Sequence, residues 1–163
     1  MSSVSSLVQG LVDARLIFPD LRERTLEGAL SELSRDVAAA GVVRDPEALA
    51  ARLVRREKDG CTGLGGGVAI PHCRTRDIGD VVLAIGVSRQ GVDFGAPDGL
   101  PVTVFFLLLS PMDAPALHLQ SLARVSRLVR TPGLIDALRA ATSADEIAEA
   151  LRVAEGPASR ATV

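Results

Sequence analysis

Two continuous apolar runs constrain the fold of this chain more than any other feature. Residues 81–87 (VVLAIGV) and 102–109 (VTVFFLLL) each have the length of a strand and contain no charged residue. A strand with one face in water alternates apolar and polar residues, whereas a strand covered on both faces is apolar throughout. The two runs therefore predict the central strands of a sheet with helices on both faces, which is an α/β architecture.

The size and composition predict one domain with an aliphatic core. A chain of 163 residues can bury one core but is too short for two ordinary domains. Hydrophobic residues make up 47% of the chain, yet aromatic residues make up only 2%. The formal net charge of −2 argues against nucleic acids and anionic membranes as partners, because a basic surface usually meets both. We expect partners among proteins and small molecules.

The compartment is predicted from three further observations. Cys61 and Cys73 are too few for a disulfide scaffold. The first residues lack the basic and apolar regions of a signal peptide. No run approaches the roughly 18 apolar residues that span a bilayer. We therefore expect a cytoplasmic protein without direct membrane insertion.

Capping residues and apolar spacing predict the helices. Thr25 precedes a run of apolar residues at three- and four-residue steps that Gly41 ends, and Asp45 with Pro46 starts a second helix. Three more helices are expected to end near residues 130, 139 and 153. Residues 16–18 and 68–70 predict short strands, and residues 90–99 predict a turn-rich connection with a brief extended piece.

These elements divide the chain into one domain and two ends. We expect the domain to cover residues 14–153. Residues 1–13 are expected to form an N-terminal extension with a short helix, and residues 154–163 a disordered tail.

The segment 60–72 (GCTGLGGGVAIPH) joins a glycine-rich loop to one of only two histidines, His72. Helix periodicity before the loop places Arg56 on the apolar face and turns Arg55 away from it. The other histidine, His118, lies in the first turn of the third predicted helix, at the edge of an inner face that also includes Leu119. Arg56 either covers apolar surface with its stem or meets a ligand near the loop.

Several other interpretations of this segment fit its residues less well. The loop does not match G-x-x-x-x-G-K-[ST] or G-x-G-x-x-G, which are the nucleotide-binding patterns. A zinc site drawn from Cys61, His72, Cys73 and His118 lacks the usual ligand spacing. A cysteine hydrolase that uses Cys73 or Cys61 with His118 lacks an identifiable orienting acid. His72 on its own also fits a histidine packed in a turn after proline.

His72, His118 and Arg56 are together the residue types that a phosphohistidine site requires. A neutral imidazole attacks phosphorus through one nitrogen while an acceptor holds the other nitrogen. A guanidinium offers several donors to the phosphoryl oxygens, and a second imidazole can donate another hydrogen bond. Such a transfer depends on positioning and charge, so we expect neither a metal nor a cofactor.

The motifs around these residues resemble a known family. Arg56-Glu57, then Thr62-Gly63-x-Gly65-x-Gly67-x-Ala69-Ile70-Pro71-His72, and later His118-Leu119-x-x-Leu122-Ala123-x-Val125-Ser126, are similar to the fructose/mannitol-type (type 2) enzyme IIA domains of the bacterial phosphoenolpyruvate-dependent phosphotransferase system, including their nitrogen-regulatory branch. The resemblance covers nearly all of residues 14–153. It implies a mixed five-stranded sheet sandwiched between helices.

The resemblance also implies roles for individual residues. His72 would accept a phosphoryl group from the phosphohistidine of HPr or of its nitrogen-branch relative. Arg56 would stabilise charge and His118 would donate a hydrogen bond to the phosphoryl group. The loop residues Thr62, Gly63, Gly65 and Gly67 would support the phosphate-binding loop.

Two uses of the phosphoryl group follow from the resemblance. In sugar transport it passes to a IIB domain, whereas in the nitrogen branch the phosphorylation state regulates target proteins by direct contact. The serine-rich start and Phe94 favour the nitrogen branch on resemblance only. The sugar is chosen elsewhere in the system, so the sequence does not identify it.

Overall fold

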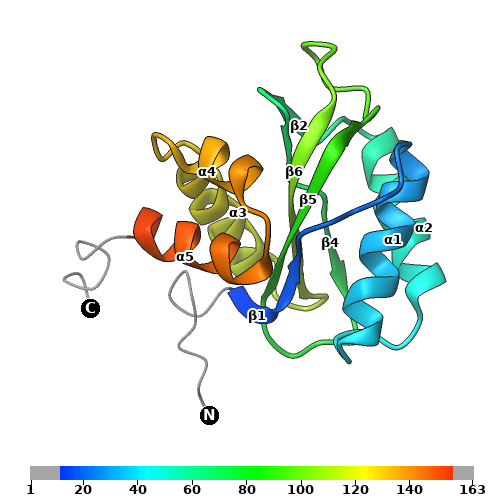
Figure 1. The fold of residues 1–163 in the computed structure, drawn as a ribbon. Coiled ribbons are helices and arrows are strands. Elements are labelled where there is room, and N and C mark those ends of the chain that lie inside the picture. The colour runs from blue at the N-terminus through cyan, green and yellow to red at the C-terminus, as the bar shows by residue number, and fades with distance from the viewer. Residues whose placement is uncertain (1–11, 156–163) are drawn as a thin grey trace.

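A mixed sheet runs through the middle of the computed structural model, which describes residues 12–155 of the chain (Figure 1). Its strands are β1 (Val12–Phe18), β2 (Gly63–Gly65), β3 (Val68–Ala69), β4 (His72–Thr75), β5 (Val82–Val92) and β6 (Val102–Pro111). The helices are α1 (Leu26–Ala39), α2 (Pro46–Lys58), α3 (Pro115–Val129), α4 (Leu134–Ala140) and α5 (Ala144–Glu155). The described helices cover both faces of the sheet, α1 and α2 on one and α3 to α5 on the other.

The strands are ordered β1-β5-β6-β3-β2, and β4 also pairs with β6. β5 and β6 are antiparallel neighbours at the centre, and β3 and β4 both run parallel to β6. The register of β6 against β3 (Val68 opposite Val104) continues unchanged into β4 (His72 opposite Leu108). β3 and β4 are therefore one strand position interrupted at Pro71, which has no backbone N–H to donate. The sheet has five positions across, as the resemblance implied.

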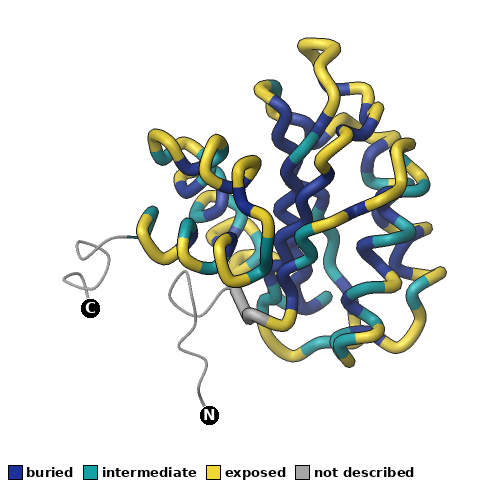
Figure 2. The backbone as a smooth tube through the Cα atoms, in the orientation of Figure 1, coloured by how far each residue is buried: buried dark blue, intermediate teal, exposed yellow. Residues whose placement is uncertain are grey.

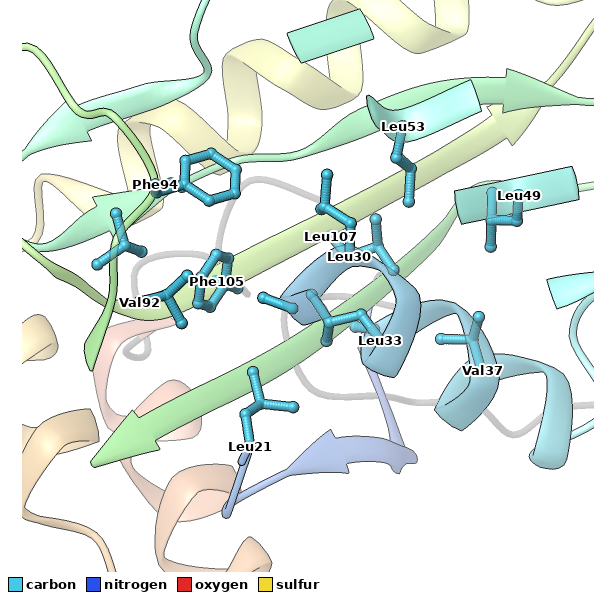
Figure 3. Packing of buried hydrophobic residues seen from close by; sticks show 14 of the residues in the cluster. Leu21, Leu30, Leu33, Val37, Leu49, Leu53, Val92, Phe94, Phe105 and Leu107 are labelled. Carbon is cyan, nitrogen blue, oxygen red and sulfur yellow. The ribbon is translucent and has the colours of Figure 1, made fainter. Parts of the chain in front are cut away.

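Side chains of β6 alternate between two cores. Val104, Phe106 and Leu108 pack in the cluster that includes residues of α3, α4 and α5. Phe105, Leu107 and Leu109 pack in the other cluster, against α1 and α2. Figure 3 shows Phe105 and Leu107 in this cluster, with Leu30 and Leu33 of α1. The buried part of the chain accordingly follows β5 and β6 through the centre of the molecule (Figure 2). The prediction of central strands covered on both faces is confirmed.

The predicted helix starts are confirmed by their hydrogen bonds. Thr25 Oγ1 accepts from the Gly28 amide at 3.1 Å, and Asp45 Oδ1 accepts from the Ala48 amide at 3.0 Å. These side chains satisfy amide donors that the first turn of a helix leaves free. Pro46 occupies the first position of α2, where its missing N–H costs nothing.

Two stretches differ from the prediction. β5 continues to Val92, past the point where the apolar run ends, so the predicted connection over residues 90–99 begins inside a strand. A register shift between Val87 and Val92 accommodates this, with Gly91 at φ 85° and its amide bonded to Ser88 Oγ. The glycine-rich loop is a β-hairpin formed by β2 and β3, and β4 was not predicted.

The predicted ends fall mostly outside the described residues. Of the helix expected over residues 1–13, only residues 12 and 13 are described, and they belong to β1. Of the tail expected over residues 154–163, Ala154 and Glu155 belong to α5, and the rest lies outside the described part. Within residues 12–155, no helix combines the length and the apolar character needed to cross a membrane.

Candidate active site

His72 begins β4, and its ring is fixed by its own backbone. Nδ1 lies 2.7 Å from the carbonyl oxygen of Ile70. A carbonyl oxygen can only accept, so Nδ1 must carry the hydrogen. In the neutral ring the lone pair is then on Nε2, which is the nucleophilic nitrogen.

The surroundings of His72 favour the neutral ring. Burial lowers the pKa of His72, and the nearby Arg56 guanidinium lowers it further. The Ile70 carbonyl and the Glu57 carboxylate oppose this, but the net direction is down. A ring with a pKa below its ordinary value keeps the Nε2 lone pair available at neutral pH.

His118 lies in the first turn of α3 and faces His72. The ring centroids are 5.4 Å apart, and the planes are inclined by 46°. Nδ1 of His118 lies 2.7 Å from the hydroxyl of Ser110, which is fully buried at the end of β6. Burial lowers the pKa of His118, and the neighbouring His72, Arg74 and Arg56 lower it further. The two histidines therefore lie side by side, as the sequence led us to expect.

An open cleft of about 550 Å³ contains both histidines. Arg56 lines it, half-buried, with its Nη1 donating to the Gly60 carbonyl at 3.0 Å. Arg55 also lines the cleft, although helix periodicity turned it away from the apolar face. The cleft opens beside the last turns of α2, so a side chain that avoids the core still reaches the site.

Arg74 is a cleft residue that the sequence pattern did not reveal. It lies two residues after His72 in β4, and alternate residues of a strand share a face. Its Nη1 donates to the Met112 carbonyl at 3.0 Å. The sequence signal for Arg74 was its position two residues after His72. This spacing indicates a shared face only if residues 72–75 form a strand, which the sequence did not predict.

Glu57 is a second residue whose part in the site was not predicted. Its side chain is buried at the end of α2, with a relative exposure of 8%. Oε1 accepts from the Thr62 amide at 2.9 Å, and Oε2 accepts from the Thr62 hydroxyl. Thr62 is thus joined to α2 and is not among the residues that line the cleft.

The loop glycines serve the β2–β3 hairpin. Gly65 and Gly67 have φ of 86° and 82°, a left-handed backbone that favours glycine. Arg139 of α4 donates to the carbonyl of Gly66 at the hairpin tip. Gly63, Gly65 and Gly67 are not among the residues that line the cleft with His72, and Gly65 borders a different pocket beside Arg139.

Leu119 is exposed, contrary to the predicted inner face of α3. The residues of α3 that are buried are Ser121, Val125 and Leu128. Leu119 has a relative exposure of 68% and lines the cleft next to His118. An apolar side chain at the mouth of the site is free for contact with another molecule.

Cys73 and His72 point to opposite faces of the sheet. His72 pairs with Leu108 of the α3 side, whereas Cys73 pairs with Leu109 and packs, half-buried, against the α1–α2 core, from where it also borders the cleft. Burial raises the pKa of the Cys73 thiol to about 11. Across residues 12–155, no group of three or more His, Cys, Asp or Glu side chains is arranged to hold a metal ion.

Comparisons with known proteins identify the family of this chain. The sequence model described as "Phosphoenolpyruvate-dependent sugar phosphotransferase system, EIIA 2" matches residues 10–153. A nitrogen regulatory protein of Bradyrhizobium diazoefficiens is 36% identical over 140 residues, which are 86% of this chain and 91% of that protein. A fructose-specific EIIA component of Haloferax volcanii is 33% identical, covering 78% of this chain and 82% of that protein.

The fold has a solved counterpart of the same kind. The crystal structure of the nitrogen regulatory protein IIA-Ntr from Neisseria meningitidis superposes with a TM-score of 0.78 at 30% identity, covering 90% of this chain and 99% of that one. The family match spans most of the chain, and its relatives include both nitrogen-regulatory and sugar-specific proteins. The chain therefore belongs to the EIIA type-2 family of the phosphoenolpyruvate-dependent sugar phosphotransferase system and is a phosphoryl-carrier component of that system.

Proposed function

We propose that Nε2 of His72 is the atom that carries the phosphoryl group. The observation that supports this most strongly is the hydrogen bond from His72 Nδ1 to the Ile70 carbonyl, which assigns the lone pair to Nε2. His72 lines an open cleft, so a protein donor can reach this nitrogen. The donor is the phosphohistidine of HPr or of its nitrogen-branch relative.

The transfer is a displacement at phosphorus. The Nε2 lone pair forms a new P–N bond while the P–N bond of the donor breaks, and the electron pair of the broken bond returns to the donor nitrogen. The proton on His72 Nδ1 stays in place, held by the Ile70 carbonyl. No metal or cofactor takes part in this scheme.

Arg56 and His118 stabilise the group during transfer. A guanidinium presents parallel N–H donors that match phosphoryl oxygens. With Nδ1 of His118 accepting from the Ser110 hydroxyl, the ring hydrogen lies on Nε2, which then donates to a phosphoryl oxygen. Thr62 contributes indirectly, because its hydrogen bonds to Glu57 fix the end of α2 that carries Arg56. The hairpin built on Gly63, Gly65 and Gly67 supports the strand that leads to His72.

The test is labelling with phosphoenolpyruvate, enzyme I and HPr. We expect an acid-labile phosphoprotein with one phosphoryl group per chain, and none in His72→Ala. His118→Ala serves as the matched control, because it should slow labelling without abolishing the acceptor. Full labelling of His72→Ala would overturn the assignment.

The onward partner is either a IIB domain or a regulatory target protein. The Bradyrhizobium relative, which this chain matches over 91% of its length, is named a nitrogen regulatory protein, and this favours the regulatory role. The Haloferax relative is named a fructose-specific component, and this supports the alternative, transfer to a IIB domain. Transfer of label to a IIB domain and capture of target proteins with and without phosphorylation separate the two. We place this activity in the cytoplasm, which suits the free thiols of Cys61 and Cys73.

A further inference from the structure

The cleft around His72 carries a positive charge that the chain as a whole does not. Four arginines line it, and Asp59 is the only carboxylate among its lining residues in the described part. The chain has a formal net charge of −2. The arginines are Arg52, Arg55, Arg56 and Arg74. The positive charge is therefore concentrated at the face where the phosphoryl donor must arrive.

Within residues 12–155, none of these arginines forms an ion pair with a carboxylate. Arg56 and Arg74 donate to the backbone carbonyls of Gly60 and Met112, and Arg52 donates to the carbonyl of Arg74. Arginines elsewhere in the described part do form ion pairs, among them Arg22, Arg139 and Arg152. Carbonyl oxygens orient a guanidinium but leave its full charge to act outward.

The arginines exceed what one phosphoryl group needs. Arg56 and Arg74 are the two whose charge acts on the histidines, since both lower the pKa of His118. Arg55 is exposed on α2, and Leu119, with 68% of its surface free, lies beside His118. A rim of charge around an apolar centre is the usual anatomy of a protein interface. Binding of a charged phosphoryl group does not require an exposed apolar side chain such as Leu119.

We propose that this face docks a protein whose phosphohistidine lies beside an apolar patch bordered by carboxylates. Arg52 and Arg55 would steer that acidic border, and Leu119 would contact the apolar patch. The proposal rests on the proposed function, because it names the kind of partner that brings phosphate to His72. Complementary charge mainly raises the association rate, while apolar contact mainly lowers the dissociation rate.

The experiment compares two phosphoryl donors on the same protein. One is a phosphorylated HPr-type carrier with carboxylates around its histidine, and the other is phosphoramidate, which has the same P–N bond but no protein surface. Initial labelling rates are measured at about 30 mM and about 300 mM ionic strength, where screening differs strongly. With the carrier we expect a fall of about tenfold at the higher salt, and with phosphoramidate a fall of less than about twofold.

Two charge-reversal variants provide the matched comparison. Arg55→Glu reverses a charge at the cleft, and Arg35→Glu makes the same change at an exposed position of α1 that does not line the cleft. We expect Arg55→Glu to slow transfer from the carrier at low salt by about tenfold more than it slows transfer from phosphoramidate. Arg35→Glu should show no such difference. Changing the carboxylates of the carrier to amides should remove the effect of Arg55→Glu.

Leu119 is tested separately. Leu119→Ser should weaken carrier binding at every ionic strength and leave the slope of rate against salt unchanged, because it removes apolar contact and no charge. Circular dichroism of each variant checks that it is folded.

The outcomes separate this proposal from the proposed function. Labelling of His72 by both donors, with no salt dependence or with faster transfer to Arg55→Glu, would overturn the acidic partner and leave His72 as the carrier. A carrier with a basic face that transfers faster than the acidic one would do the same. Failure of both donors to label His72 would overturn the proposed function and this proposal together. Salt-dependent self-association of this chain, without capture of the carrier, would assign the face to a second copy and also contradict the proposal.

Discussion

The carboxylate of Glu57 accepts hydrogen bonds from both the backbone amide and the hydroxyl of Thr62, so the last turn of α2 is joined directly to the residue before β2. Both side chains are buried, with relative exposures of 8% for Glu57 and 6% for Thr62. A buried carboxylate needs its donors, because water does not replace a lost one. Arg56 directly precedes Glu57 in sequence, so this contact holds the arginine of the site in place.

Thr62→Val is therefore expected to lower the free energy of unfolding by about 1–3 kcal/mol, because it leaves Glu57 Oε2 without its hydroxyl donor. Thr142→Val is the matched control: the Thr142 amide and hydroxyl also donate to a single carboxylate, that of Glu146, but at an exposed position. It should cost about 0.5 kcal/mol, because water takes over. Urea denaturation measures both, and equal losses would show that burial of the contact does not matter.

Ser110→Ala is expected to slow phosphoryl transfer to His72 severalfold without changing the final extent of labelling. The substitution removes the partner that orients His118 through Nδ1. Ser34→Ala is the control, because Ser34 is equally buried but bonds to the Leu30 carbonyl of its own helix. Single-turnover labelling measures the rates. A slower rate in Ser34→Ala of the same size would point to a general loss of packing.

The two histidines should make the protein less stable at mildly acidic pH. Their pKa values are lowered in the folded state from the ordinary value of 6.5, so just below pH 6.5 the unfolded chain binds more protons than the folded chain. The free energy of unfolding then rises with pH. As far as the histidines are concerned, the free energy of unfolding is highest above pH 6.5. It decreases as the pH falls through 6.5 and stops decreasing below the folded pKa values.

This pH dependence is measured by urea denaturation of the natural chain and of a His72→Gln, His118→Gln double variant. The difference between the two chains isolates the histidines from carboxylates whose pKa values also shift, such as Asp36, raised mainly by burial, and Asp98, lowered mainly by the Gly66 amide. We expect the slope of stability against pH just below 6.5 to be smaller in the double variant. An NMR titration of either histidine with a midpoint above 6.5 would contradict a lowered pKa in the folded protein.

The thiol of Cys73 should react far more slowly than that of Cys61. Cys73 packs half-buried against the core, and burial raises its pKa to about 11, so at pH 8 about one thiol in a thousand is ionised. Cys61 is exposed. Peptide mass spectrometry after brief treatment with iodoacetamide should find the label on Cys61, with Cys73 labelled only after denaturation. Comparable labelling rates of both thiols in the folded protein would contradict the raised pKa of Cys73.

Gly67→Ala should destabilise the protein more than Gly66→Ala. Both glycines have positive φ, at 82° and 64°, so both substitutions strain the backbone. Only at Gly67 would the new Cβ also collide with the guanidinium of Arg139, which bonds to the Gly66 carbonyl. We expect an extra loss of about 1 kcal/mol for the displaced hydrogen bond.

An Arg139→Met background tests this explanation. There the extra loss at Gly67 should disappear, while the backbone strain common to both glycines remains. A difference that persists without Arg139 would assign the cost to another neighbour, such as Thr103.

The elements that were predictable are those with local causes. The apolar run around Phe105 and Phe106 and the caps Thr25 and Asp45 each act within a few residues, and each formed where expected. The pairing of His72 with His118 was also anticipated, since the chain has only two histidines and each lies in a recognisable motif.

What was missed depends on contacts between distant segments. β4 contains His72, Cys73, Arg74 and Thr75, and nothing in these four residues indicates a strand until β6 lies beside them. The leucines of α3 form too wide a stripe for periodicity to choose the buried side, and packing against the sheet turned Leu119 outward.

The unbroken register of β3 and β4 against β6 separates the nucleophile from the glycine hairpin. His72 is anchored to the centre of the sheet through its pairing with Leu108, whereas the hairpin tip at Gly66 is held by two side chains, Arg139 at its carbonyl and Asp98 at its amide. We therefore expect a small change at the tip to leave the position of the phosphoryl acceptor unaltered. This makes the hairpin a suitable position for a fluorescent reporter or an affinity tag, one that senses neighbouring partners without disturbing the chemistry.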